Sequence, residues 1–317
     1  MGKASRTKQD VDRRARIAAQ REAERRAEQR KRIYLAGGSI LVVAIVVIAV
    51  VLVKLNSGTA AASNGPTGTA LASVTKQVTN IPVSVTDKVA DGGVNKGVFV
   101  PTQTTAQVSS AAQQGSYFGT VNGTALTSGG KPEVLFLGGN YCPFCAAERW
   151  AMVNALSRFG TFTGLTTTHS SSTDSDPNTP SFTFYKSKYT SNYINFTSVE
   201  EYTNTPDSNG GYKTLETATA DQQKLQQTYD PQLAIPFLDL GGKYVEVGNL
   251  APLDPSLLSG KTWAQVASAM NDPTSTIGKA EVGNANYLTA AICKLTNNQP
   301  ATACTPAIQK LQANFAS

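Results

Sequence analysis

Two of the four cysteines in the chain are separated by only two residues, in the motif Cys142-Pro143-Phe144-Cys145. A thiolate attacks a disulfide to form a mixed disulfide, and a second thiol within one helical turn can then resolve it. The spacing therefore favours thiol–disulfide exchange, with Cys142 as the nucleophile and Cys145 as the resolving thiol. Phe144 carries no charge, so it should not lower the pKa of the neighbouring thiol as a histidine there could.

Three other uses of this pair stay open. Zinc normally takes four ligands, but the other cysteines lie far downstream and the chain has one histidine, His169. A purely structural disulfide is the second alternative, although so short a loop makes a strained and reducible bond. An inert reduced pair is the third, and it does not suit an oxidising compartment. We favour the redox centre and expect no metal and no cofactor.

The residues around the motif predict where it lies. The apolar run at 134–137 is typical of a central strand buried on both faces, and the apolar residues of 146–156 recur at helical spacing. Pro143 suits the first turn of a helix, where its missing N–H would be unpaired anyway. We therefore expect Cys142 at a strand-to-helix junction. There its exposed sulfur would point toward unpaired N–H groups and the positive end of the helix dipole.

The rest of the folded part predicts an α/β mixture. We expect further strands at 162–169, 182–185 and 193–196, and helices at 215–229, 263–270 and 285–295. Residues 235–247 predict a hairpin with a Gly241-Gly242 turn. Glu148 lies one turn beyond Cys145, so it could accept a proton if it is buried. A solvated carboxylate, or one paired with Arg149 or Arg158, is favoured.

The basic residues of the chain are concentrated at its start. The net charge is +6, and residues 1–32 hold 12 Lys and Arg against 5 Asp and Glu. The remainder is close to neutral, so the folded part is not expected to bind nucleic acid. A solvated tail that sets membrane topology is favoured over a tail that binds anionic lipids or nucleic acid.

An apolar segment at 33–55 follows this tail. About 20 apolar residues in a helix cross the ~30 Å hydrocarbon layer, so one transmembrane helix is expected. Lys and Arg resist translocation, which predicts a cytoplasmic N-terminus and an extracytoplasmic C-terminal domain at the cell membrane. A signal peptide cleaved near 58–62 is the alternative, but its hydrophobic region usually spans only about 7–15 residues.

Composition sets the remaining boundaries. Residues 56–72 are rich in Ser, Gly, Thr and Ala without apolar periodicity, which predicts a flexible linker. Residues 73–317 are expected to form one extracytoplasmic domain. Its first part, up to residue 115, is expected to be an extended arm with a short strand at 81–85.

The stretch Val134–Leu156 resembles the active-site strand, turn and helix of the thioredoxin superfamily. Its Cys-Pro-aromatic-Cys pattern is closer to glutaredoxins and to Dsb-type periplasmic oxidoreductases than to thioredoxins. The resemblance implies a thioredoxin-like fold, a central mixed sheet flanked by helices. It also implies a cis-proline before a late strand, with its backbone facing the redox sulfurs. Ile235-Pro236 fits that place, which gives both residues a substrate-binding role.

The long interval between Cys145 and Pro236 is similar to the Dsb-type layout, in which an inserted, largely helical segment interrupts the fold. The string 141–150 also resembles domain-of-unknown-function family 929, thioredoxin-like proteins of archaea and actinobacteria. That resemblance covers roughly residues 75–317 and implies a fold and a redox centre, without a substrate.

The second cysteine pair, Cys293 and Cys304, closes a short polar interval. In an extracytoplasmic domain it is expected to form a structural disulfide that ties the last helix to the C-terminal segment. A shuttle pair that exchanges electrons with Cys142 and Cys145 is the alternative. The staple is favoured because no helix start activates either thiol.

Together these features predict a membrane-anchored oxidoreductase that makes, breaks or isomerises disulfides in exported proteins that contain cysteine. Its electrons are expected to pass to or from a quinone-linked partner in the membrane. The alternative is a non-catalytic binding or structural domain at the cell surface, on a thioredoxin scaffold with structural disulfides. Whether the protein is an oxidant, a reductant or an isomerase stays open, because one sequence does not give the reduction potential.

Overall fold

The computed structural model describes residues 65–93, 100–101, 119–248 and 253–315, all of them within one unit, Asn64–Ser317. The basic tail expected at 1–32 and the transmembrane helix expected at 33–55 lie outside these residues. None of the helices that are described is long and apolar enough to span a membrane.

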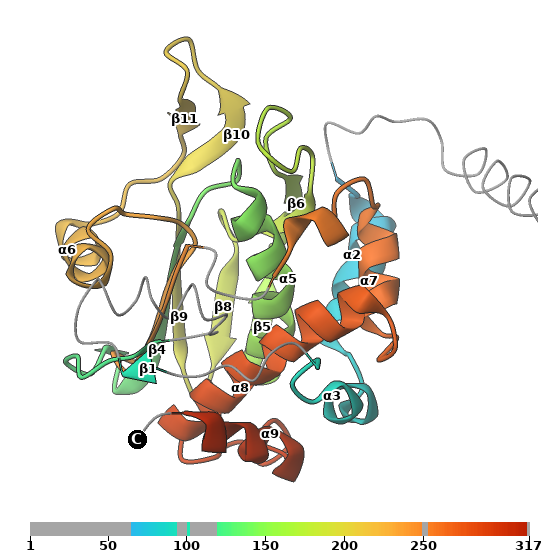
Figure 1. Ribbon diagram of the computed structural model, residues 1–317, viewed down its shortest axis with the longest axis vertical. Helices are drawn as coiled ribbons and strands as arrows, with labels where there is room; N and C mark the ends of the chain where they lie inside the picture. Colours follow the sequence, from blue (N-terminus) through green and yellow to red (C-terminus); the bar gives the residue numbers. More distant parts are fainter. Residues whose placement is uncertain (1–64, 94–99, 102–118, 249–252, 316–317) are drawn as a thin grey trace, which may run out of the picture. The chain divides into compact units, whose positions relative to one another are not determined.

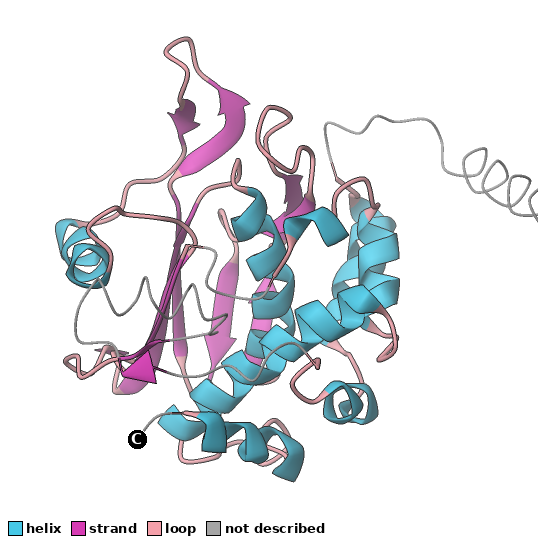
Figure 2. Ribbon diagram, in the orientation of Figure 1, coloured by secondary structure: helices cyan, strands magenta, loops and turns pink. Residues whose placement is uncertain are grey.

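A mixed sheet of seven strands, counted over the described residues, forms the centre of this unit (Figure 2). Its middle strand, β4 (Lys131–Gly138), pairs parallel with β9 (Asn195–Glu200) and antiparallel with β12 (Phe237–Leu240). Beyond β12 follow β13 (Tyr244–Val247), β2 (Gly119–Thr120) and β1 (Val100–Pro101), while β3 (Thr127–Ser128) pairs with the start of β4. The central strand predicted from the run at 134–137 is confirmed.

Successive residues of β4 point to opposite faces of the sheet. Val134 and Phe136 pack into a core shared with α5 (Pro143–Ser157) and α8 (Gly283–Leu295). Leu135 and Leu137 pack into a smaller core on the other face, together with α6 (Ala220–Tyr229). Figure 1 shows the sheet between α6 on one side and α5 with α8 on the other. Because both faces are covered, residues 134–137 of β4 form a continuous apolar run instead of alternating with polar residues.

Further helices lie on the α5 side of the sheet. α2 (Gly68–Thr79) packs against α5 and against α7 (Trp263–Met270), and α9 (Pro306–Leu311) packs against α8. A π-helix, η2 (Gly278–Val282), leads directly into α8, and two short 3-10 helices are η1 (Pro255–Leu257) and η3 (Gln312–Asn314). The helices predicted at 263–270 and 285–295 are confirmed. The helix predicted at 215–229 begins later, because Thr219 and Gln222 form a capping box at the start of α6.

The N-terminal part of the domain is helical where a linker and an extended arm were expected. α2 starts inside the predicted linker at 56–72, and α3 (Val83–Val89) replaces the predicted strand at 81–85. Val74 and Val78 of α2 are buried four residues apart, on one side of a helix whose other residues are mostly small or polar. So narrow an apolar stripe gives little signal in the sequence, which is why the predictions are wrong over α2 and α3. The rest of the predicted linker up to residue 64, and most of the arm after residue 93, lie outside the described residues.

The inserted segment between α5 and β12 is partly helical, as the fold class predicts, since it contains α6. Strands outnumber helices among its described elements, so the largely helical insertion of the Dsb-type layout is not found. Three small antiparallel sheets occupy it: β5 (Gly160–Thr163) with β8 (Lys188–Ser191), β6 (Thr166–His169) with β7 (Pro180–Thr183), and β10 (Tyr202–Pro206) with β11 (Tyr212–Thr214). The strand expected at 162–169 is divided in two at Gly164, whose φ of +71° breaks the extended backbone.

The predicted hairpin at 235–247 is confirmed as the pair β12 and β13. Gly241 and Gly242 form its turn with φ values of +66° and +68°. Both angles lie in the left-handed region that glycine enters without a steric cost. The backbone N–H of Gly242 donates a hydrogen bond to Oδ1 of Asp239 at 2.6 Å.

Candidate functional site

Cys142 is the N-cap residue of α5, immediately after the turn that follows β4. Pro143 occupies the first helical position, and the backbone N–H of Cys145 donates to Sγ of Cys142 at 3.3 Å. The first turn of a helix leaves backbone N–H groups without helical partners, and they stabilise a negative charge there. The predicted position of the motif at a strand-to-helix junction is confirmed.

The two thiols of the motif have pKa values shifted in opposite directions. The pKa of Cys142 is lowered, mainly by a hydrogen bond with the Cys145 side chain. Burial opposes this shift. The backbone N–H groups of Cys145 and Phe144 and the positive charge of Arg149 add to it. Burial raises the pKa of Cys145 well above its usual range. Cys142 is therefore the more readily ionised of the two. A lowered pKa suits an attacking thiol, because the thiolate is the reactive species.

Cys142 is less exposed than the sequence predicted. Its exposed fraction is 6%, and that of Cys145 is 0%. Both are free thiols, and the thiol of Cys142 donates to the backbone oxygen of Ile235 at 3.7 Å. The expectation of an exposed first sulfur is wrong, because a segment far along the chain lies against it.

That segment is the Ile235-Pro236 pair, which precedes β12. The peptide bond between the two residues is cis, as the sequence led us to expect. Pro236 is buried and Ile235 is partly exposed. The structure thus brings Cys142, Cys145 and Ile235 together, with Pro236 next in the chain.

A buried ion pair supports the motif from the same helix. Nε and Nη2 of Arg149 donate to the two carboxylate oxygens of Glu200 at 2.9 and 2.5 Å, and both side chains are fully buried. Oε1 of Glu200 also accepts the backbone N–H of Phe184 at 2.9 Å. The guanidinium carbon of Arg149 lies 5.5 Å from the ring centre of Phe136 in β4. The positive charge of Arg149 lowers the pKa of both Cys142 and Cys145.

The sequence analysis missed this pair as part of the site. One signal was present, because Arg149 comes four residues after Cys145 and so shares its side of the helix. Its partner Glu200 is 51 residues away and has no local signal. The pairing between Glu148 and Arg149 that the sequence suggested does not form, since Arg149 is bound to Glu200.

Glu148 is buried rather than solvated, which corrects the favoured expectation. It is 1% exposed, and Oε2 accepts a hydrogen bond from Nδ2 of Asn284 at 2.8 Å. Burial raises the pKa of Glu148 to about 8, and the charge of Glu148 helps to raise the pKa of Glu246 in β13. Burial also raises the pKa values of Glu246 and of Glu281 in η2 well above their usual range. These three residues form a buried carboxyl cluster in which burial favours the protonated form.

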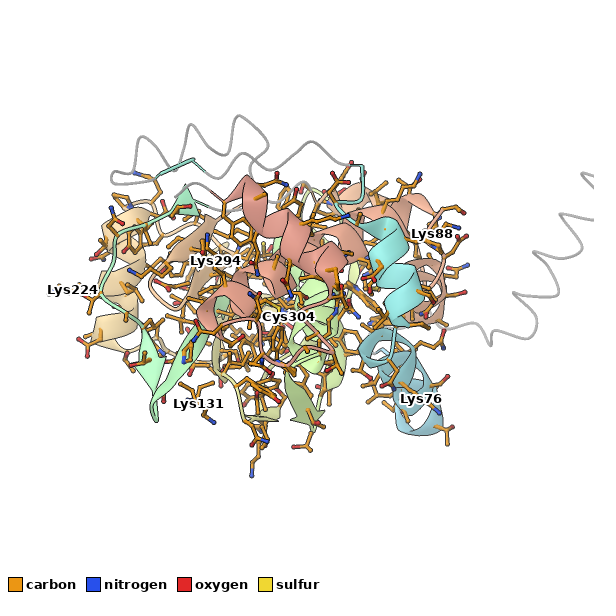
Figure 3. The ribbon with its side chains drawn as sticks, turned by 90° about the horizontal axis from the view of Figure 1, so that it is seen from below. Lys76, Lys88, Lys131, Lys224, Lys294 and Cys304 are labelled. Carbon is orange, nitrogen blue, oxygen red and sulfur yellow. A yellow bond between two sulfur atoms is a disulfide. The ribbon has the colours of Figure 1, made fainter. Side chains whose placement is uncertain are left out.

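Cys293 and Cys304 form a disulfide that joins α8 to the turn before α9, with a Cα–Cα distance of 5.7 Å. Both side chains are buried. In the view from below, Cys304 is near the centre (Figure 3). Its role as a structural staple stays a prediction.

The remaining polar candidates do not form a metal centre in the part of the chain that is described. Over those residues, no group of three or more His, Cys, Asp and Glu side chains is arranged to hold a metal ion. His169 lies in β6, and its Nδ1 hydrogen-bonds with the backbone oxygen of Ser170 at 2.7 Å.

Comparison with known proteins gives one match. The family model DUF929, a domain of unknown function, matches residues 117–294, which include the cysteine motif, the buried ion pair and the Ile235-Pro236 segment. A search of curated proteins and a search of solved structures each found no match.

Proposed function

The chain belongs to the DUF929 family, domains of unknown function, and we propose that it is a thiol–disulfide oxidoreductase with a thioredoxin-like fold. The observation that carries the proposal is the geometry at Cys142. Its sulfur lies at the N-terminus of α5, accepts the N–H of Cys145 and contacts the carbonyl of Ile235. The shifts in pKa distinguish this thiol from Cys145.

The proposed reaction exchanges one disulfide for another. The Cys142 thiolate attacks one sulfur of a substrate disulfide, and the other sulfur leaves as a thiolate that takes up a proton. The Cys145 thiol then loses its proton and attacks Sγ of Cys142, which releases the second substrate thiol. Two electrons and two protons pass to the substrate, and the enzyme is left with a Cys142–Cys145 disulfide. The same steps in reverse oxidise a substrate dithiol.

Several features support the thioredoxin-like part of the proposal. The motif joins the central strand β4 to α5, and the chain then returns to the sheet through β9 parallel to β4. The cis Ile235-Pro236 bond precedes β12, and the Ile235 carbonyl faces Sγ of Cys142. The mixed sheet with helices on both faces is compatible with this fold.

The proposed location rests on the sequence of residues 1–55. A basic tail followed by an apolar segment long enough for one transmembrane helix would hold the domain outside the cell membrane. The substrates would then be exported proteins that contain cysteine. A quinone-linked thiol–disulfide partner in the membrane would take electrons from the motif, or supply them.

One observation favours a second candidate function. Cys142 is only 6% exposed, which is little surface for a nucleophile that must meet a protein disulfide. A non-catalytic cell-surface binding domain on the same scaffold would need no more exposure than this. The two candidate functions differ in whether the cysteine motif catalyses the turnover of a disulfide substrate.

The test is to measure the reduction potential of the Cys142–Cys145 pair and the turnover of a disulfide substrate by the full chain. A potential above about −300 mV together with turnover supports the oxidoreductase. Cys142→Ser should abolish turnover, and Cys145→Ser should accumulate a mixed disulfide through Cys142. A potential well below about −300 mV without turnover, or activity that survives Cys142→Ser, would contradict the proposal. The first of these results would favour the non-catalytic binding domain.

A further inference from the structure

A pocket of about 660 Å³ lies on the side of Cys142 formed by Tyr141 and Ile235. Tyr141 precedes Cys142 in the chain, and the carbonyl of Ile235 contacts Sγ of Cys142 at 3.7 Å. The rest of the pocket wall comes from the β10–β11 hairpin and its base, from α6 and from the segment before β12. A substrate bound here would therefore lie next to the residues that flank the reactive sulfur.

Three tyrosines form the aromatic wall of the pocket. Tyr141 stacks on Tyr212 with the ring centres 4.0 Å apart and an angle of 9°, and it meets Tyr202 edge-on at 6.0 Å. Burial raises the pKa of Tyr141, so this phenol stays neutral. Tyrosine faces attract cations through the negative charge of the ring face. Leu233, an exposed apolar residue, adds surface for an aliphatic stem.

The charged side chains that line the pocket are both acidic. Oδ1 of Asp207 accepts the backbone N–H groups of Asn209 and Gly211 at 2.7 and 3.0 Å, which fixes the carboxylate in the hairpin turn. Within the described part of the chain, Oδ2 of Asp207 has no hydrogen-bond partner, and the carboxylate of Glu201 has neither a hydrogen bond nor an ion pair. Burial raises the pKa of Glu201, because it removes water from the ionised carboxylate and no described protein group replaces that water. A cation in the pocket would supply a stabilising partner.

No described Lys or Arg lines this wall. Lys224, on the same helix as the pocket residue Gln223, points outward at the rim of the molecule (Figure 3). Among the described residues, neither Glu201 nor Asp207 forms an ion pair with a Lys or Arg side chain.

We propose that this pocket binds a lysine or arginine side chain of a polypeptide substrate, close in sequence to the cysteine that reacts with Cys142. The aliphatic stem would lie against Leu233 and the tyrosine faces, and the charged end would meet Glu201 and Asp207. This inference rests on the proposed function, because it names the substrate class of that site. It makes the pocket a determinant of which cysteines react.

The test separates binding from redox chemistry. Fluorescently labelled peptides that contain serine in place of cysteine, and lysine, norleucine or glutamate two residues away, are titrated against the full chain. Norleucine matches the stem of lysine without its charge. We expect the lysine peptide to bind at least tenfold more tightly than the norleucine peptide and the glutamate peptide to bind most weakly. The difference should shrink at high salt.

Two nearly isosteric substitutions supply the matched variants. Glu201→Gln and Asp207→Asn remove charge but keep size, and the amide oxygen introduced by the second can still accept the two turn N–H groups. The double variant should lose the tenfold preference for lysine while binding the norleucine peptide as the parent does. Thr203→Ser in the same hairpin, outside the pocket lining, is a control that should retain the preference.

Turnover of a small neutral disulfide reports on the proposed function alone. The double variant should reduce it at the parent rate but reduce a disulfide peptide that contains lysine with a kcat/KM about tenfold lower. Equal affinity of the parent for the three peptides, or an equal loss for all of them in the double variant, would overturn the inference. If the small disulfide is not turned over but the lysine peptide still binds selectively, the oxidoreductase proposal fails while the cation pocket stands.

Discussion

Arg149 of α5 and Glu200 at the end of β9 form a fully buried ion pair through two hydrogen bonds, of 2.9 and 2.5 Å. The pair connects α5 to β9, the strand that runs parallel to β4. It also holds a positive charge on the helix that carries Cys142 and Cys145, and that charge lowers the pKa of both thiols. Substitutions can separate what this ion pair contributes to stability from what it contributes to the pKa values of the two thiols.

Breaking the pair from either side should change the Cys142 pKa in opposite directions. Arg149→Met removes the positive charge and should raise this pKa, whereas Glu200→Gln leaves the charge uncompensated and should lower it further. Both variants should lose roughly 3–5 kcal/mol of stability, because each leaves a polar group buried without its partner. The ultraviolet absorbance of the thiolate against pH measures the first effect, and urea unfolding measures the second.

Arg149→Lys is the matched control for this pair. It keeps the charge but loses the planar two-bond contact, so it should lower stability while the thiol pKa stays close to that of the parent. Shifts in the same direction in Arg149→Met and Glu200→Gln would show that the thiol responds to lost packing rather than to charge.

Cys142 should be alkylated before Cys145 in the reduced protein. The pKa of Cys142 is lowered and that of Cys145 is raised, and Cys142 retains 6% exposure where Cys145 has none. Iodoacetamide at neutral pH followed by peptide mass spectrometry measures the order, since the thiolate is the reactive species. Initial modification of Cys145, or equal rates at the two sites, would contradict the assignment of the nucleophile.

The buried carboxyl cluster of Glu148, Glu246 and Glu281 should make the domain less stable as pH rises. The pKa of Glu148 is raised to about 8 in the folded state, so between its usual value and about pH 8 the unfolded chain ionises while the folded one keeps its proton. Stability is therefore highest below this window and falls through it, on the order of a few kcal/mol. Urea unfolding at a series of pH values measures the slope.

Glu148→Gln should flatten that slope, because the amide cannot ionise and can still accept the hydrogen bond from Asn284. Asp221→Asn, at the exposed start of α6, is the control and should leave the slope as in the parent. A parent whose stability rises from pH 5 to pH 8 would be incompatible with the burial of uncharged carboxyls.

Loss of the Cys293–Cys304 disulfide should lower stability without changing the turnover proposed for Cys142 and Cys145. The bond closes a loop with a sequence separation of 11, which corresponds to about 2–3 kcal/mol. The double variant Cys293→Ala with Cys304→Ala avoids an unpaired thiol, and its stability and its turnover of a small disulfide are measured side by side. If this double variant loses turnover as the Cys142 variants do, Cys293 and Cys304 act as an electron-shuttling pair and not as a structural staple.

The sequence by itself determined the features that depend on neighbouring residues. The strand at 134–137, the helix after Pro143 and the Gly241-Gly242 turn each follow from short-range spacing and backbone conformation, and all three are present. The same local logic placed Cys142 at the helix start. The resemblance to a known fold added the Ile235-Pro236 position, which local spacing alone would not have singled out.

Only the tertiary structure decided what surrounds these elements. The partner of Arg149, the burial of Glu148 and the contact of Ile235 with Cys142 join residues that are far apart in sequence. So does the pocket wall, where Tyr141 stacks on Tyr212. Such contacts depend on which faces meet when strands and helices pack, and burial then sets the charge states. For this reason the sequence placed Cys142 at the start of a helix, while the accessibility and the electrostatic surroundings of its sulfur required the fold.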